Sequence, residues 1–279
     1  MSPTPTESRI FATRYQREAI RLEQLHANNI APGHTKWVDA MKAVWDRMDK
    51  AGSPLKQSAI VSKVINYVSN IKSEEKIAFP LAAYAGKRTA GLMLATLEFD
   101  NHPLVGPNED GVSVVKFTLK VPRDGNSNIK VTPLAYISRH AIERMHERRN
   151  RPITHARATE MFAAVAALGF MIGFHEEHNA MCLDLGDVLA VGQMRAVAGP
   201  PNNEGRRSYG SMYEVRSMLP IEELDPNDLR LKQGRVALAA VNEWVEGGRK
   251  DRQSFSDRVP VLAPRTETYT TKTAVMATA

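Results

Sequence analysis

Three segments near the start of the chain have apolar residues at the three- and four-residue steps of an amphipathic helix. They are residues 7–29, residues 35–51, which open on a threonine that is a candidate N-cap, and residues 53–71, which open on a serine cap followed by proline. Residues 80–99 fit a helix, because they are rich in alanine, or a strand. We therefore expect residues 1–100 to form a mainly helical region.

The middle of the chain has the pattern of an α+β unit, which we expect over residues 101–220. Its turn-rich start, with Asp-Asn-His-Pro and Gly-Pro-Asn sequences, is a candidate boundary between subdomains. Residues 112–121 alternate β-branched and polar residues and predict a strand, and two helices are predicted over residues 139–150 and 154–169. Four further strands are predicted at residues 170–174, 179–185, 188–196 and 209–219.

The last part of the chain predicts one helix and a tail. Residues 221–248 contain an Asp-Pro start signal, an apolar stripe and a Gly-Gly stop, which indicate a C-terminal helix. In residues 249–279, charged residues and then Ser, Thr and Pro replace the core pattern, so we expect a disordered tail. The expected fold class is α+β, with a helical N-terminal part, a two-helix plus antiparallel-sheet unit and a C-terminal helix.

Composition narrows the class of protein without identifying a function. Hydrophobic residues make up 43% and charged residues 24% of the 279 residues, which is typical of globular proteins and excludes wholesale disorder, collagen and a coiled coil. The single cysteine, Cys182, excludes an intramolecular disulfide and a multi-cysteine zinc site. Because neither a signal-peptide pattern nor an apolar run of membrane-spanning length is present, we expect a cytoplasmic protein with no membrane partner.

Charge is concentrated in one segment, residues 138–157. The whole chain has a formal net charge of +6, and this segment has six arginines and only two glutamates. A basic surface of this kind favours phosphate groups as ligands, because guanidinium groups match phosphate oxygens bidentately. The arginines are Arg139, Arg144, Arg148, Arg149, Arg151 and Arg157.

The predicted helix at residues 139–150 combines this charge with a histidine. At 100° per residue, His140, Arg144 and Arg148 fall on one face, opposite an apolar stripe that can pack on a core. His140 follows a candidate serine cap, near the helix end whose dipole favours anions and a neutral imidazole. A neutral imidazole can act as a general base while the guanidinium groups stabilise a pentacovalent phosphate. The face therefore has the groups needed to bind or cleave a phosphodiester without a metal or another cofactor.

The sequence Ser138-Arg-His-Ala-Ile-Glu-Arg-Met-His-Glu-Arg148 resembles the Ser-x-His-Ala-x-x-Arg helix of small bacterial domains similar to BrnT toxins and, more remotely, to the RelE-type ribonuclease fold. The match covers about a dozen residues closely and about eighty, over residues 138–219, loosely. The resemblance implies RNA as substrate and metal-independent cleavage, with His140 as acid or base and Arg144 and Arg148 as phosphate binders. This chain differs from that group in its large helical N-terminal part and in a long loop before the last strand.

Other interpretations of the same segments stay open. The basic helix can be a solvated surface whose arginines pair with Glu143 and Glu147 one turn away. His175 and His178 are metal-ligand types, but their spacing is one residue short of the zincin motif. Cys182 can be a nucleophile with a histidine as its base, although a lone cysteine in a strand is more often an inert apolar residue. A loop from residue 199 onward carries further candidate nucleic-acid contacts, namely Arg206, Arg207 and the ring of Tyr209.

Three functions follow from these patterns. The first is a metal-independent nucleic-acid phosphodiesterase, an RNase-like toxin or effector, in which Arg139, Arg149 and Arg151 add phosphate contacts. The second is a non-catalytic nucleic-acid-binding accessory protein of plasmid or phage origin. The third is a bacterial effector that acts through protein partners, with the N-terminal helices as a candidate partner-binding surface. We favour the first, with RNA as the partner, because a histidine at the start of an arginine face is more than binding alone requires.

Overall fold

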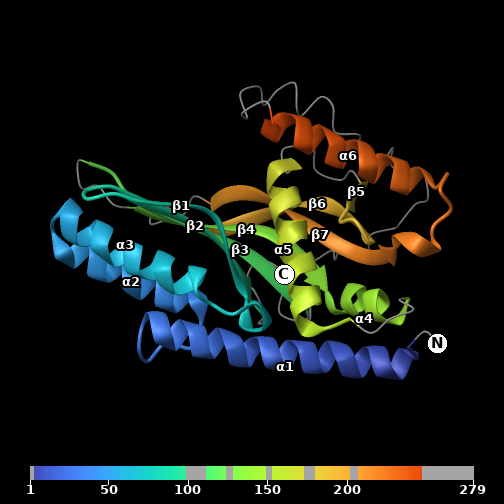
Figure 1. Ribbon diagram of the computed structural model, residues 1–279, viewed down its shortest axis with the longest axis horizontal. Coiled ribbons are helices and arrows are strands. Elements are labelled where there is room, and N and C mark those ends of the chain that lie inside the picture. Colours follow the sequence, from blue (N-terminus) through green and yellow to red (C-terminus); the bar gives the residue numbers. More distant parts are fainter. Residues whose placement is uncertain are drawn as a thin grey trace, which may run out of the picture.

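A computed structural model describes residues 3–98, 111–123, 128–148, 153–172, 180–201 and 207–246. It is an α+β fold, as the sequence predicted, built on a curled seven-stranded sheet with helices against it (Figure 1). The N-terminal helices are α1 (Pro5–Ile30), α2 (Trp37–Ala51) and α3 (Pro54–Ser69), followed by a short 3₁₀ turn at Ser73–Glu75. The first four strands are β1 (Ala78–Ala85), β2 (Ala90–Glu98), β3 (Gly111–Val121) and β4 (Asn128–Ser138).

Two helices follow β4, three further strands complete the sheet, and a last helix follows these strands. The helices are α4 (Arg139–Glu147) and α5 (His155–Ile172), and the strands are β5 (Ala180–Asp184), β6 (Val188–Pro201) and β7 (Arg207–Pro220). A 3₁₀ turn at Ile221–Glu223 precedes α6 (Leu229–Glu246). None of the described helices is long and apolar enough to cross a membrane. The tail predicted for residues 249–279 lies outside the described residues.

The sheet consists of two antiparallel meanders joined by one short parallel pairing. Its strand order is β1-β2-β3-β4-β7-β6-β5, and only β4 and β7 run parallel. Their pairing covers three residue pairs, Ala135–Ile137 with Tyr213–Val215. The boundary expected near residue 100 falls between β2 and β3, which pair along the whole length of β2, so one sheet extends across it.

The N-terminal helices begin where local polar side chains can accept the free backbone N–H groups. At α1, the Thr4 and Glu7 side chains form a reciprocal capping box that the sequence analysis did not identify. At α3, the Ser53 side chain is the cap that was predicted. The cap predicted for α2 is wrong: Lys36, not the threonine before it, is the N-cap residue, and its side chain makes no capping bond. Instead, Glu23 of α1 accepts the Trp37 N–H at 3.2 Å, so a tertiary contact replaces a local one.

Three segments of the sheet differ in clarity between sequence and structure: one was left open, one was not predicted and one was predicted wrongly. Residues 80–99 contain most of β1 and β2, which are joined at Gly86, whose N–H donates to the Thr89 carbonyl at 2.7 Å. Strand β4 was not predicted, because Pro133 interrupts its pattern; the proline is accommodated where the β3–β4 register shifts. The strand predicted at residues 170–174 is wrong at residues 170–172, which continue α5, since a short apolar run fits a buried helix equally well. Residues 173–174 lie outside the described residues.

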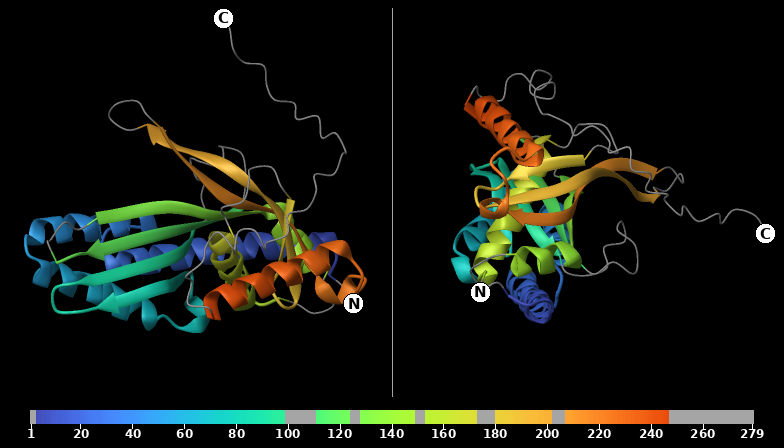
Figure 2. Two further views of the ribbon diagram at one scale, coloured as in Figure 1. Left: turned by 90° about the horizontal axis from the view of Figure 1, so that it is seen from above. Right: turned by 90° about the vertical axis from the view of Figure 1, so that its right-hand side faces the viewer.

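The two faces of the β1–β4 meander pack against different helices. Residues such as Leu94 and Phe117 contact the apolar sides of α2 and α3. On the other face, Leu97 and Val114 belong to a core formed with α4, α5 and β7, which includes Phe162. Figure 2 shows α1, α2 and α3 on one side of these strands, and α5 and α6 toward the end from which α4 begins.

Candidate functional site

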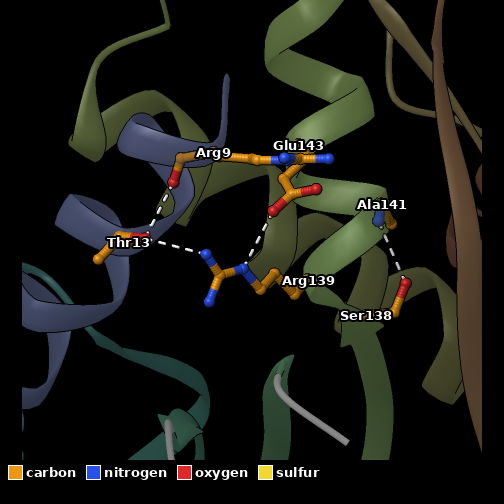
Figure 3. A network of polar contacts seen from close by, with 6 residues as sticks. All are labelled: Arg9, Thr13, Ser138, Arg139, Ala141 and Glu143. Atoms are coloured by element: carbon orange, nitrogen blue, oxygen red, sulfur yellow. Dashed lines mark hydrogen bonds and ion pairs between the residues drawn. The ribbon is translucent and has the colours of Figure 1, made fainter. Parts of the chain in front are cut away.

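Helix α4 continues directly from β4, and this connection fixes the orientation of its basic face. Ser138 ends the strand and caps the helix, and its Oγ accepts the Ala141 N–H at 3.1 Å (Figure 3). The stripe predicted to face the core is buried: Ala141, Ile142 and Met145 are at most 3% exposed. His140 is exposed. The predicted orientation of the helix is therefore confirmed.

The structure brings His140 and Arg144 together on the exposed side of α4. Arg144 Nε lies 3.5 Å from His140 Nε2, so the guanidinium faces the imidazole as a donor. The same guanidinium donates from Nη1 to Glu147 at 2.9 Å. Both partners of this ion pair keep part of their surface in solvent, and such pairs contribute only about 0.3–0.5 kcal/mol. An incoming phosphate can therefore displace Glu147 at a small cost.

Arg139 connects α4 to α1 (Figure 3). Its Nε donates to Glu143 at 3.0 Å, and its Nη2 donates to the Thr13 hydroxyl at 3.0 Å, while that hydroxyl donates to the Arg9 carbonyl at 2.9 Å. The Arg139 side chain is 35% exposed. Two of the α4 arginines are thus paired with glutamates of their own helix, as the solvated-surface interpretation predicted. Arg139 has a structural contact in addition to any contact with a ligand.

The remaining predicted arginines are placed only in part. Arg148 ends α4, where its N–H donates to the Arg144 carbonyl at 3.1 Å, and its side chain is half-buried. Arg207 is the first residue of β7, and its side chain is not described. Arg149, Arg151 and Arg206 lie outside the described residues. The structure therefore assembles His140, Arg144 and Arg148 on one helix and leaves the wider arginine set untested.

A second histidine of α4 has a role that the sequence analysis did not assign. His146 is buried, its Nδ1 lies 3.2 Å from the Ser8 hydroxyl, and its ring stacks on Phe11 at 4.3 Å between centroids. Burial lowers the pKa of His146, although the negative charge of Glu7 acts in the opposite direction. His146 thus holds α1 against α4 and does not face solvent with His140. The helical period of the sequence predicts that residue 146 lies on the buried face of α4. It does not identify the residues of α1 that His146 contacts.

The alternative chemistries of the β5 region are not supported by the described residues. Burial raises the pKa of the Cys182 thiol to about 11, which keeps it protonated near neutral pH and unsuited to act as a nucleophile. Asp184 accepts the Gly186 N–H at 2.8 Å and closes the β5–β6 hairpin. His175 and His178 lie outside the described residues, and the described part of the chain holds no group of three metal-binding side chains.

The sequence analysis missed a second basic region, in β1–β4. Residues 76–98, 111–123 and 128–138 contain seven lysines and arginines and one acidic residue, the buried Glu98. An excess of basic residues spread over three separated segments is a signal that a search for dense charge runs does not detect. No family model, curated protein or solved structure matches the chain, so these two basic surfaces are interpreted from their own geometry.

Proposed function

We propose that this protein binds RNA and that the exposed face of α4 is a phosphodiesterase site. The observation that carries the proposal is the contact of His140 Nε2 with the Arg144 guanidinium at 3.5 Å, on an exposed helix face. A proton acceptor and a phosphate-binding cation side by side are the two groups that metal-independent cleavage needs. The resemblance of residues 138–148 to the helix of BrnT-like and RelE-type toxins supports the same chemistry.

In the proposed reaction, the 2′-hydroxyl of RNA is the nucleophile. Its oxygen forms a bond to phosphorus while the bond between phosphorus and the 5′-oxygen breaks. Arg144 turns from His140 Nε2 to the non-bridging oxygens, which it binds together with Arg148, and the freed Nε2 takes the 2′-hydroxyl proton. Water protonates the departing 5′-oxygen. The products are a 2′,3′-cyclic phosphate and a 5′-hydroxyl. DNA has no 2′-hydroxyl, so it is a ligand and not a substrate.

The test is cleavage of a labelled RNA, and of the same oligonucleotide with a single 2′-deoxy position at the cleaved bond, in the presence of a chelator. We expect His140→Ala to lower the cleavage rate by about 100-fold or more, the usual contribution of a general base, with binding unchanged within threefold. His34→Ala is the matched histidine control, and Arg21→Ala, which breaks an exposed ion pair of the same three-residue spacing as Arg144–Glu147, is the control for Arg144→Ala. Equal cleavage by wild type and His140→Ala would exclude the proposed site.

A non-catalytic accessory protein is the second candidate function. It is favoured by the ion pairs Arg139–Glu143 and Arg144–Glu147, which neutralise part of the helix face. This candidate expects salt-dependent binding of RNA with no cyclic phosphate product at any protein concentration. A toxin-like effector that acts through a protein partner is the third, supported by apolar side chains exposed on the N-terminal helices, Ile10, Leu25 and Leu55. We also propose a cytoplasmic location, because a reducing compartment suits a chain with one free, buried cysteine.

A further inference from the structure

One end of the β1–β4 meander presents a basic surface that the α4 proposal does not use. This basic sheet end consists of residues from the β1–β2 turn, from β3 and its end, and from β4, together with one exposed aromatic ring of β1. We propose that the basic sheet end binds single-stranded nucleic acid, with the ring as a stacking platform. Its members are Tyr84, Lys87, Arg88, Lys120, Arg123 and Lys130.

Strand register places the central members on one face. Tyr84 pairs with Gly91, Gly91 with Lys120, and Lys120 with Asn128, so these four residues form a row across all four strands. Residues directly opposite in antiparallel strands project to the same side. The next row, two residues further along each strand, ends in Lys130, which pairs with Thr118. Tyr84, Lys120 and Lys130 therefore share one face of the sheet.

That face is the one turned away from α2 and α3. The residues that alternate with it along β3 and β4, Leu119 and Ile129, pack in the core with those two helices. The described helices of the other side, α5 and α6, lie toward the opposite end of the strands (Figure 2, left). The β1–β2 turn is fixed from behind, because the Ser58 hydroxyl of α3 donates to the Gly86 carbonyl. The surface is thus supported by α3 without being covered by it.

Tyr84 is placed for stacking by the glycine opposite to it. The Tyr84 side chain is 55% exposed, yet its ring lies directly over Gly91, where an added Cβ would be 2.8 Å from Tyr84 Cζ. A glycine at this position lets the ring rest on the sheet, so one ring surface is supported and solvent reaches the other. A supported ring with an open side stacks on any base, because every base has a π-face.

Charge distribution selects a polyanion as the ligand. Lys87, Arg88, Lys120, Arg123 and Lys130 are all exposed, and none takes part in an ion pair within the described residues. On the same face, burial and, to a smaller extent, the charge of Lys130 lower the pKa of Lys116 to about 8. A bound phosphate backbone supplies counter-charges to the five exposed cations. The α4 arginines differ, because two of them already have glutamate partners.

A single strand fits this surface better than a duplex or a lipid bilayer. The stacking ring shares a face with Lys120 and Lys130, whereas the bases of a duplex are hidden behind its two backbones. Four strands spaced about 4.8 Å apart form a surface about 14 Å wide, so we expect the site to hold a few nucleotides. The surface lies on other elements than α4, so its test does not depend on the cleavage assay.

The experiment measures binding of a fluorescent 12-nucleotide oligo(U) and oligo(dT) by anisotropy, over a range of salt concentrations, in the His140→Ala full-length chain. We expect Lys120→Ala/Lys130→Ala to weaken binding at least tenfold. The slope of log K against log[salt] should become shallower by about 1.4, the value expected for the loss of two phosphate contacts with a single strand. Tyr84→Ala should weaken binding at least fivefold with the slope unchanged, and Tyr84→Phe, which keeps the ring, should bind within twofold of wild type. The matched control is Lys56→Ala/Lys63→Ala, which removes the same charge from exposed positions on α3.

Three results would overturn the proposal. Equal weakening by the two double-lysine variants would show that only the total charge matters. Unchanged binding by Tyr84→Ala would exclude the stacking platform. Tighter binding to duplex DNA or to phosphatidylglycerol vesicles than to either single strand would assign the surface to another ligand. Failure of cleavage alone would leave this proposal standing and remove only the α4 site.

Discussion

Glu98, at the end of β2, has a strongly perturbed carboxyl group. Burial, and to a smaller extent the charges of Glu23 and Asp39, raise its pKa to about 8, while the charge of Lys36 acts in the opposite direction. Glu23 is itself buried and accepts the Trp37 N–H. Two buried carboxyl groups that influence each other are best accommodated when one of them, Glu98, holds a proton.

The stability of the Glu98→Gln variant relative to wild type should therefore increase as pH rises. The pKa of this carboxyl group is about 8 in the folded chain and has an ordinary value of 4.5, so the folded chain binds more protons between these pH values. Wild-type stability therefore falls as pH rises from 4.5 to 8. Glutamine mimics the protonated form at every pH. We expect the variant to gain a few kcal/mol of unfolding free energy relative to wild type between pH 5 and pH 9, measured by urea unfolding. A difference that is constant over this range would contradict the assignment.

At the scale of elements, α1 is attached to α4 and α5 through two imidazole rings, of the buried His146 and the half-buried His155. His146 of α4 stacks on Phe11, and His155 of α5 lies 4.6 Å from the Tyr15 ring. Neither ring nitrogen of His155 has a hydrogen-bond partner among the described residues. Burial lowers the pKa of both histidines, which means that the folded chain holds them in the neutral form.

Acid should loosen α1 selectively. Because both pKa values are lowered, the unfolded chain binds more protons than the folded chain below the ordinary histidine pKa of 6.5, so stability is lost as pH falls through that value. We expect hydrogen-exchange protection factors in the first half of α1 to fall between pH 7.5 and pH 5. Helix α6, whose described side chains make no histidine contact, is the internal reference. Parallel loss of protection in both helices would indicate global destabilisation instead.

The elements that the sequence predicted correctly are those with local signals. Helix α3 has its serine cap and proline at its start, α4 has a clear apolar stripe, and β3 alternates apolar and polar residues from Val115 to Val121. Strands β2 and β4 do not alternate, because β2 is buried on both faces and Pro133 interrupts β4. The α4 residues could be predicted because they lie on one helix. The basic sheet end could not, because only the register of four strands brings Tyr84, Lys120 and Lys130 together.

At the scale of the whole molecule, continuity of the sheet depends on a short stretch of β7. Tyr213, Glu214 and Val215 pair with β4 on one side, and Glu214 and Val215 pair with Gln193 and Gly192 of β6 on the other. Gly192 lies so close to β7 that an added Cβ would be 2.8 Å from Tyr213 Cζ and 3.0 Å from the Glu214 carbonyl carbon. The two meanders are thus held together where β6, β7 and β4 approach most closely.

Gly192→Ala should weaken the connection between the two meanders. The added methyl group meets backbone atoms that cannot rotate away, so β6 must move from β7, and we expect a loss of about 2 kcal/mol or more of unfolding free energy. Arg216→Ala, an exposed neighbour on β7 with a long 3.7 Å ion pair to Glu214, is the control and should change stability by less than about 0.5 kcal/mol. If Gly192→Ala is as stable as wild type in urea unfolding, the close packing at this position is contradicted.

The parallel pairing of β4 with β7 also has a consequence for the order in which the chain folds. Strands β1 to β4 pair with their immediate neighbours along the chain, and so do β5 to β7. Pairing of β4 with β7 instead has to close a long loop that contains α4, α5 and two strands, and closing long loops is slow and entropically costly. During synthesis, the first meander can therefore form on α2 and α3 before β7 leaves the ribosome, and β7 then completes a sheet whose edge at β4 is already in place.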